Sequence, residues 1–482
     1  MKFRFPDLFD AYGMPGHTVR SLKLVIWAVA FGIVNFNIIT GIAMAGYLRA
    51  VGVNDFVFGL LYAIGPALSP LQLLGSYLLE RTQKRKGILI AFGMIHRIVW
   101  LPFGLVPFFV PMDQITLQIW MLALFLFLAA FAGPFLNVSF FSLAADLVPG
   151  RIRGRYFAVR MRVFTITGIM GGILTAWLLD SFPAFYSYAL VFALASVTGI
   201  LEIVFYFGVK FPEMTRRPKN DESLNFMKML GVVVRNRPYM RFIFFMTLWL
   251  FSLNLAGPFI LVHLHENVLL SNTLITVFVQ ILPNICSVLI LARWGRALDA
   301  HGNKTVMQVA NGILCAAPFL WIFTTNNFIS IVLIILIGFM TGLLLPGFDL
   351  GANNIMMGHA PKVNRSMYIA LYFTCTSIIG VGLGNATGGW LLEHVFSRFE
   401  EAGIVLLGVT LTRFGYLFAL TALLRCFIVY IALPRMVKEE SAPFVLLKEA
   451  HKATRRIILR RRAYLRYLLR RGRVRGRVRR KS

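Results

Sequence analysis

Long apolar segments separated by short charged breaks set the strongest limit on what this chain can fold into. Three of them, residues 22–48, 115–145 and 328–357, are each long enough to cross the core of a bilayer, which takes about 20 residues. Of the 482 residues, 58% are hydrophobic and only 14% are charged, whereas soluble domains carry about 25% charged residues. The pattern therefore predicts an all-α polytopic membrane protein.

Twelve apolar segments can be separated along the chain. The expected transmembrane ranges are 22–48, 55–79, 87–109, 115–147, 157–180, 185–209, 239–265, 271–294, 305–325, 328–357, 366–394 and 411–434. The linker between the sixth and seventh ranges divides these helices into two sets of six. We therefore expect two pseudo-symmetric six-helix bundles.

The two halves of the chain repeat each other. Pro134-Phe-Leu-Asn137 has a counterpart at Pro346-Gly-Phe-Asp349, and Trp177-Leu-Leu-Asp180 has one at Trp390-Leu-Leu-Glu393. A tandem duplication in a membrane protein is typical of transporters whose binding site lies between the halves. One difference breaks the symmetry, because Asn137 in the first copy is Asp349 in the second.

Lysine and arginine predict the orientation of the helices. Lys and Arg are concentrated in the loops of one side, in segments such as 81–86, 151–155 and 216–237. The loops of the other side contain few basic residues beyond Arg49, Arg398 and Arg413. The positive-inside rule places the basic side in the cytoplasm, and an even number of spans puts both termini there. We expect a multi-pass protein of the cell (inner or plasma) membrane.

This organisation predicts five segments. They are a cytoplasmic N-terminus (1–21), an N-terminal bundle (22–210), a cytoplasmic linker (211–238), a C-terminal bundle (239–434) and a basic cytoplasmic tail (435–482). In the linker, Leu224, Met227, Leu230 and Val234 recur at the spacing of an amphipathic helix that lies on the membrane surface. A passive tether is the alternative.

The tail combines arginine clusters with apolar residues at helical spacing, among them Leu446, Ile457 and Leu468. A basic amphipathic helix beside a membrane binds anionic lipid headgroups, and we expect this role. The alternative is contact with RNA through the Arg-Gly run at residues 471–477, since arginine-rich segments can fold onto RNA. We expect no nucleic-acid partner, because no folded RNA-binding module accompanies the run.

The loop after the eighth predicted span reads Gly295-Arg-Ala-Leu-Asp299-Ala-His-Gly302-Asn-Lys304. It resembles a loop signature of the major facilitator superfamily, Gly-x-x-x-Asp-x-x-Gly-x-Arg/Lys. In this interpretation Gly295 permits close helix approach, and Asp299 offers a carboxylate to helix N-termini and arginines. Gly302 allows a tight turn and Lys304 supplies the cytoplasmic charge, so that the loop latches a cytoplasmic gate. The counterpart that begins at Gly75 departs from the pattern.

The loop after the fourth predicted span is similar to a second pattern of the same superfamily, acid-x-x-Pro-x-x-x-Arg-Gly. The matching residues are Asp146, Pro149, Arg153 and Gly154, followed by Arg155. We expect Asp146 to pair with one of the two arginines in one state of a gate. The alternative is a static surface salt bridge worth about 0–1 kcal/mol.

The resemblance implies that the first, fourth, seventh and tenth helices line a central cavity, flanked by the second, fifth, eighth and eleventh. Polar residues near mid-membrane on these helices are then candidates for substrate contact. They are Asn35, Asn37, Asn137, Asn254, Gln280, Asn284, Asp349 and Asn385. Each amide could instead hold two helices together. Pro134 and Pro346 should each free a carbonyl one turn earlier, near Ala130 and Gly342.

Other polar residues within the spans are expected to be structural. Arg97 on the third span and Glu202 on the sixth should pair, and a place in a proton path is the alternative. The four cysteines lack the spacing of a metal or redox motif, so we expect free thiols and no bound metal.

These observations predict a secondary active or facilitative transporter, a symporter or uniporter, that moves a small solute by alternating access. No P-loop, dinucleotide or metal signature is present, which argues against ATP-driven transport, an enzyme or a bound cofactor. If transport is coupled to protons or cations, Asp349 is the preferred carrier. The amide-rich candidate set disfavours a strongly anionic substrate. The alternative to transport is a non-transporting receptor or scaffold that acts through its basic tail. We expect the protein to be a monomer.

Overall fold

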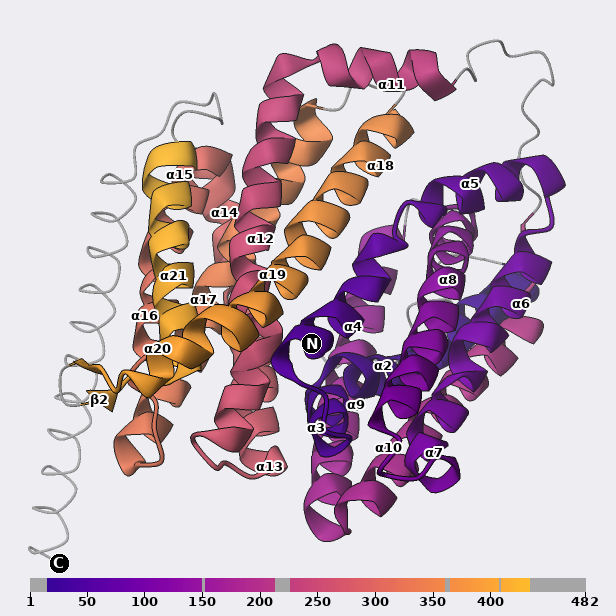
Figure 1. Ribbon diagram of the computed structural model, residues 1–482. Helices are drawn as coiled ribbons and strands as arrows, with labels where there is room; N and C mark the ends of the chain where they lie inside the picture. Colours follow the sequence, from indigo (N-terminus) through magenta and orange to yellow (C-terminus); the bar gives the residue numbers. More distant parts are fainter. Residues whose placement is uncertain (1–14, 150–151, 213–225, 360–364, 407–408, 434–482) are drawn as a thin grey trace, which may run out of the picture.

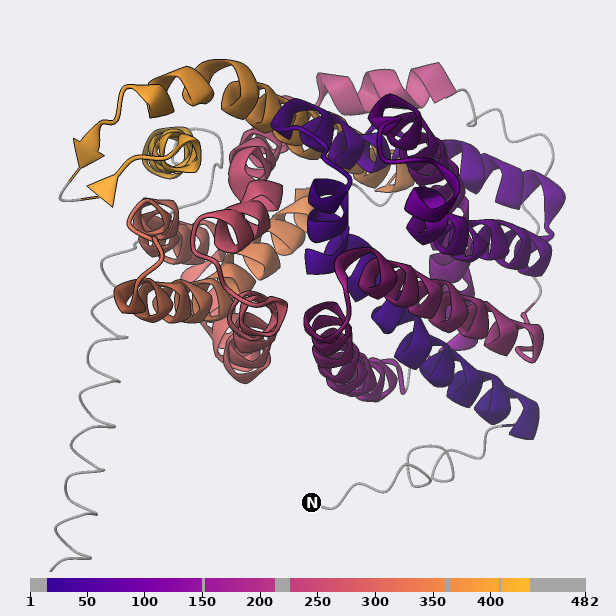
Figure 2. The same cartoon turned by 60° about the horizontal axis from the view of Figure 1, so that its bottom comes forward.

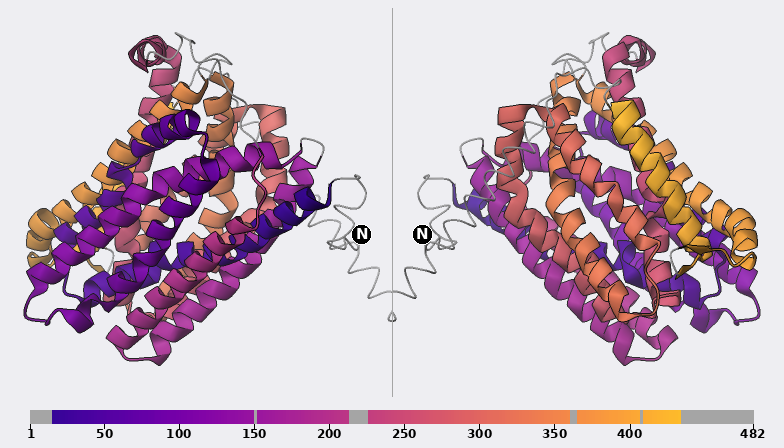
Figure 3. Two further views of the ribbon diagram at one scale, coloured as in Figure 1. Left: turned by 90° about the vertical axis from the view of Figure 1, so that its right-hand side faces the viewer. Right: turned by 90° about the vertical axis from the view of Figure 1, so that its left-hand side faces the viewer.

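The computed structural model describes residues 15–149, 152–212, 226–359, 365–406 and 409–433, and these are almost entirely helical. Figure 1 shows two helical bundles side by side, the first coloured indigo to magenta and the second pink to yellow. Figure 2 shows the same division between the halves of the chain, and in the two side views of Figure 3 one bundle lies in front of the other. The predicted fold of two bundles is therefore confirmed.

The first bundle contains six membrane crossings, three of which are interrupted helices. Its elements are α2 (Gly16–Thr40), α3 (Ile42–Ala50), α4 (Asp55–Ala67), α5 (Leu71–Thr82), α6 (Arg85–Ile98), α7 (Trp100–Phe109), α8 (Ile115–Leu147), α9 (Arg153–Ser181) and α10 (Ala184–Phe207).

The second bundle contains more irregular helix, including several π-helical segments labelled η. Its elements are α12 (Arg237–Glu266), α13 (Asn272–Ile275), η2 (Thr276–Ile281), α14 (Leu282–His301), α15 (Asn303–Leu314), α16 (Ala316–Trp321), α17 (Phe328–His359), α18 (Arg365–Cys375), η3 (Thr376–Leu383), α19 (Gly384–Leu391), η4 (Leu392–Phe396), α20 (Ser397–Glu401), β1 (Val405–Leu406), β2 (Val409–Thr410), α21 (Arg413–Phe427) and η5 (Ile428–Ala432).

The ninth crossing differs from its prediction. In the described part of the chain, eleven helical stretches are long and apolar enough to cross a membrane, and the predicted range 305–325 is not one of them. It is built from α15 and α16, separated by a turn at Cys315. Pro318 explains the break, because its ring lacks an N–H and clashes with the carbonyl four residues earlier, at Leu314, where α15 ends. With this broken helix counted, the structure has the twelve predicted crossings.

The repeat in the sequence is also a repeat in packing. In the first bundle α2 packs against α10, α6 against α8, and α5 against α8. In the second bundle α12 packs against α21, α15 against α17, and α14 against α17. Large apolar side chains such as Trp120 and Phe328 are exposed, as expected for helices that face lipid.

The linker forms α11 (Phe226–Arg235), which lies across one end of the second bundle (Figure 1). Its Val233 is completely buried against that bundle, whereas Val234 is exposed. A helix in the linker is therefore present as predicted, but Leu224 and the basic tail lie outside the described residues. We call the end of the molecule that carries α5 and α11 the linker end, and the opposite end, with α13 and β2, the ion-pair end.

A buried polar network holds the first bundle together. Arg97 Nη2 lies 2.6 Å from Glu202 Oε2, so the predicted pair is confirmed, and Arg97 also donates to Asn35 Oδ1. Asn35 in turn donates to a backbone carbonyl of α10 at 2.8 Å. Gly32 and Gly199 make room for the network, because a Cβ on either would collide with the Glu202 carboxyl group or the Arg97 side chain. Three helices, α2, α6 and α10, are thus tied into one unit.

Arg97→Met should destabilise the protein by about 3–5 kcal/mol, because it leaves the Glu202 carboxylate buried without its partner. The double variant Arg97→Met/Glu202→Leu should recover a large part of that loss. Thermal unfolding of the purified protein measures both effects, with Arg398→Met, an exposed arginine, as the matched control. A double variant that is as unstable as the sum of the two single variants would contradict this account.

Candidate functional site

A cavity of about 440 Å³ lies between the two bundles. Its walls come from α2 and α9 of the first bundle and from η2 and α14 of the second. Its volume lies in the range of about 300–1,000 Å³ that is usual for small-molecule sites. The polar lining residues are Asn37, Thr40, Thr165, Gln280, Asn284 and Ser287.

Both walls of the cavity contain irregular helix. The first crossing is interrupted at Gly41, where the backbone is extended, and a Cβ at this position would lie 2.9 Å from Gln280 Nε2. Gln280 itself belongs to the π-helical segment η2. Short π-helical segments inside α-helices are frequent at functional sites. The break at Gly41 and the π-helix therefore bring the two bundles close together beside the cavity.

The carbonyl that Pro346 frees is used within the second bundle. Ser287 Oγ donates to Gly342 O at 3.1 Å, and Trp294 Nε1 donates to Leu343 O at 2.6 Å. The predicted free carbonyl near Gly342 thus exists, but it anchors α17 to α14 rather than pointing to a solute. The corresponding role for Pro134 and Ala130 stays a prediction.

The structure separates the predicted cavity residues into groups. Asn37, Gln280 and Asn284 line the cavity. Asn137 on α8 and Asp349 on α17 are exposed, but neither is among its lining residues. Among the described residues neither of these two side chains has a hydrogen-bond or ion-pair partner.

Three predicted cavity residues lie elsewhere. Asn35 is completely buried in the network around Arg97, so we remove it from the candidate set. Asn254 donates to a carbonyl of its own helix, and its Cβ packs against Gly384 of α19. Asn385 is buried where the bundles meet, and its amide donates to Tyr62 O at 3.3 Å. The amides of Asn35 and Asn385 thus join helices, which is the alternative stated above, whereas the amide of Asn254 bonds within α12.

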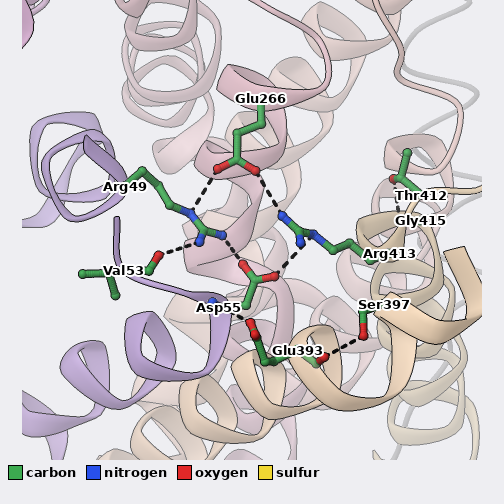
Figure 4. Close-up of polar contacts among 9 residues, drawn as sticks. All are labelled: Arg49, Val53, Asp55, Glu266, Glu393, Ser397, Thr412, Arg413 and Gly415. Carbon is green, nitrogen blue, oxygen red and sulfur yellow. Dashed lines mark hydrogen bonds and ion pairs between the residues drawn. The ribbon is translucent and has the colours of Figure 1, made fainter. Parts of the chain in front are cut away.

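Four charged side chains form a ring at the ion-pair end (Figure 4). Arg49 at the end of α3 and Asp55 at the start of α4 come from the first bundle. Glu266 at the end of α12 and Arg413 at the start of α21 come from the second. Each bundle thus contributes one positive and one negative charge, and the signs alternate around the ring.

The ring is bonded more tightly within each bundle than between them. Arg49 hydrogen-bonds to Asp55, and Arg413 Nη2 donates to Glu266 Oε2 at 3.3 Å. Between the bundles, Arg49 Nε lies 3.1 Å from Glu266 Oε1, and Arg413 Nε lies 3.3 Å from Asp55 Oδ2. Arg49 Nε and Asp55 Oδ2 have no hydrogen-bond geometry, so the contacts between the bundles are Coulombic. The bundles can part here without breaking a hydrogen bond of the ring.

The repeated Trp-Leu-Leu-acid motif supplies two more links at the same end. Glu393 Oε2 accepts a hydrogen bond from the backbone N–H of Asp55 at 3.1 Å (Figure 4). Asp180 accepts from the backbone N–H groups of Asn272 and Thr273, both at 3.0 Å. Each bundle therefore places a carboxylate on the N-terminus of a helical segment in the other, where the helix dipole favours negative charge.

Close backbone packing completes this end of the interface. A Cβ on Gly389 of α19 would lie 3.2 Å from the Cα of Gly59 on α4 and would collide with the carbonyl of Asp55. The absence of side chains at Gly59 and Gly389 thus lets α4 and α19 touch. In Figure 1 the bundles lie closest near these two helices and diverge toward α5 and α18.

Sequence reasoning did not identify the ring. Two of its members, Arg49 and Arg413, stand out in the sequence as basic residues on the otherwise basic-poor side. The repeated acids Asp180 and Glu393 were found as markers of the duplication and not as contacts. Nothing in the sequence pairs these six residues, because they lie on separate helices of both bundles.

At the linker end, Asp146 has a different partner from the one predicted. Arg85 Nη1 lies 2.6 Å from Asp146 Oδ2, and Arg85 also donates to the hydroxyl and carbonyl of Ser142 and to Pro212 O. The side chains of the predicted partners, Arg153 and Arg155, and the environment of Gly154 lie outside the described residues. The Arg85–Asp146 pair joins α6 and α8 within the first bundle, so it does not link the bundles in this conformation.

Within residues 295–304, α14 ends at His301 and α15 begins at Asn303. Gly302 between them has φ +78°, a left-handed conformation that favours glycine, as the predicted turn requires. A Cβ on Gly295 would meet no atom within 4 Å, so close helix approach at Gly295 stays a prediction for another state of the gate. Asp299 is exposed and has no ion-pair partner among the described residues, whereas Lys304 is buried.

No metal centre is apparent in the described ranges. They contain no group of three or more His, Cys, Asp or Glu side chains that could hold a metal ion, and all four cysteines are free thiols.

The hydrogen bonds and ion pairs described above that join the two bundles lie toward the ion-pair end. They involve α4, α9, α12, α13, α19, η4 and their neighbours. Among the described residues, the polar links between the bundles therefore lie at this end.

Comparison with solved structures identifies the same architecture. A mutant of the nucleoside transporter NupG superposes with a TM-score of 0.68 at 14% sequence identity, covering 86% of this chain and 100% of that one. A bacterial homologue of the iron transporter ferroportin in its inward-facing state gives 0.62 at 14% identity, covering 88% and 98%. A D-xylose-proton symporter gives 0.60 at 13% identity, covering 89% and 100%.

No curated protein matches the chain in sequence. The family model of the Major Facilitator Superfamily, in contrast, matches residues 24–293 and 240–472, which together span most of the chain. The match includes both bundles and agrees with the loop signatures at Asp146 and Gly295. The protein is therefore a multi-pass membrane protein that belongs to the Major Facilitator Superfamily.

Proposed function

We propose that the protein carries a small solute across the membrane by alternating access, with the cavity between the bundles as the solute site. The observation that carries the proposal is the unequal bonding of the interface. The ring, the two carboxylate–helix contacts and the α4–α19 packing join the bundles at the ion-pair end. At the linker end, Asp146 pairs within its own bundle, and Asp299 has no ion-pair partner among the described residues.

The orientation of the two ends follows from charge. The basic loops and the linker lie at the linker end, and the positive-inside rule places that end in the cytoplasm. In this proposal the structure represents an inward-facing state with its outer end closed. A receptor or scaffold of the same fold is not favoured, because it needs no interface that closes at one end and opens at the other.

The transport step that we propose is a rocking of the two bundles about the cavity. The Coulombic contacts of Arg49 with Glu266 and of Arg413 with Asp55 separate as the outer end opens. The same motion brings α14 toward the first bundle at the cytoplasmic end. Gly295 and Asp299 would then reach the contacts that they lack in the inward-facing state.

Asp349 remains our proposed carrier of a coupling proton or cation. Its carboxylate is exposed on a membrane-spanning helix and has no partner among the described residues. The equivalent position in the first bundle is the neutral Asn137. A carboxylate without a fixed counter-charge can take up and release a proton or cation during the cycle, whereas an amide cannot.

Arg413→Gln should shift the population toward the outward-open state by about 1 kcal/mol, or about fivefold, since it removes one of the two Coulombic contacts between the bundles. A membrane-impermeant maleimide added outside the cell measures this, with Thr40→Cys as the reporter in a background without native cysteines. Arg398→Gln, which has no ion pair among the described residues, should leave the labelling rate unchanged. Equal labelling of Arg413→Gln and the unmodified reporter would contradict the proposal, as would a reporter that is never labelled.

Asp349→Asn should abolish the dependence of uptake on a pH or cation gradient and leave solute exchange at equilibrium intact. Proteoliposomes that contain the purified protein measure both activities side by side. Asn254→Ser, a substitution at an amide that bonds within its own helix, is the matched control and should retain the gradient dependence. Full gradient dependence in Asp349→Asn would exclude the carrier role.

A further inference from the structure

The cavity between the bundles also specifies a class of solute. We infer that it takes a neutral, hydroxyl-bearing ring with one apolar face, such as a sugar or a nucleoside. This inference rests on the proposed function, because it treats the cavity as the solute site. It goes beyond that function in naming the chemistry that the walls recognise.

Charge is the first argument. None of the residues that line the cavity is Asp, Glu, Lys, Arg or His. A carboxylate, a phosphate or an ammonium group would lose its hydration on entry and find no opposite charge in the walls. Burial of an unpaired charge is far more costly than burial of a hydrogen-bonded polar group. Strongly ionic solutes are therefore disfavoured.

The hydrogen-bonding capacity of the walls is the second argument. Four polar groups in the lining already donate to backbone carbonyls: Thr40 Oγ1 at 2.7 Å, Thr165 Oγ1 at 2.9 Å, Ser287 Oγ at 3.1 Å and Asn37 Nδ2 at 2.9 Å. The three hydroxyl donors and one of the two N–H groups of Asn37 are used, and the oxygens of all four side chains can still accept hydrogen bonds. This part of the lining mainly accepts, which matches solute hydroxyl groups.

Gln280 and Asn284 supply most of the donors that remain. Both lie on the wall formed by η2 and α14, and neither hydrogen-bonds to another residue in the part of the chain that the structure describes. Each side-chain amide has one carbonyl and one NH₂ group, so it can both donate to and accept from a hydroxyl group. Together with the four acceptors, they form a lining with more acceptors than donors.

The rest of the lining is apolar. Ile33, Phe164, Val279 and Leu291 contribute hydrocarbon surface from both bundles. A solute that bears hydroxyl groups all round would leave this surface in contact with polar atoms, which is unfavourable. A ring that presents C–H groups on one side and hydroxyl groups at its edge satisfies both parts of the lining.

Matched pairs of neutral and anionic probes test the inference: glucose with glucuronate, and uridine with uridine monophosphate. Calorimetric titration of the purified, unmodified protein should show binding of at least one neutral member, at least tenfold tighter than its anionic partner. Gln280→Leu and Asn284→Leu should each weaken that binding about tenfold, which corresponds to the loss of one or two hydrogen bonds. Gln114→Leu, outside the cavity, should not.

Three results would overturn the inference: tighter binding of an anionic member, no binding of any neutral member, or neutral binding that survives both cavity substitutions. Unchanged thermal unfolding of the variants establishes that they are folded. Exchange of the bound probe across proteoliposomes separates this inference from the proposed function. A probe that binds in the cavity but is never transported would contradict transport and leave the solute class standing.

Discussion

Alternating charges join the two bundles at the ion-pair end, and the account of the interface depends on this ring. Two opposite pairs, Arg49 with Asp55 and Arg413 with Glu266, are each bonded within a bundle and face each other across the interface. Their mutual attraction is strengthened because Asp55 is almost fully buried, at 1% exposure. The links between the bundles are weaker than those inside them. Such an arrangement fixes the relative position of the two bundles. A change of about 1 kcal/mol in the free energy of their interaction can still separate them at this end.

Because the chain is duplicated, the two bundles contribute equivalent contacts to this end of the interface. Asp180 and Glu393 end the same repeated motif, and each caps a helical segment of the opposite bundle. In the proposed rocking motion the first bundle would move as a unit, because the Arg97 network ties three of its helices together. Rigid bundles joined by weak contacts at one end are what a rocking motion requires. The departures from symmetry, at Asp349 and around Gly302, are the places where the two halves differ in chemistry.

Much of the fold could be predicted from the sequence, because apolar runs and the positions of prolines and glycines are local signals. Most spans, the turn at Gly302 and the Arg97–Glu202 pair were anticipated in this way. The ring could not be predicted, since its members lie on four separate helices and meet only when both bundles are in place. Asn35 was misplaced for a related reason: helical spacing shows that a residue is near mid-membrane, but not which side of the helix faces the cavity.

The central claim is that the two ends of the interface open alternately. Spin labels at positions 82 and 237 report the distance between the bundles at the linker end, and labels at 112 and 402 report it at the ion-pair end. Double electron–electron resonance in lipid nanodiscs should show two populations for each pair, and neutralising Arg49 and Arg413 should lengthen one distance as it shortens the other. Distances that stay fixed, or that change in the same direction at both ends, would contradict the account.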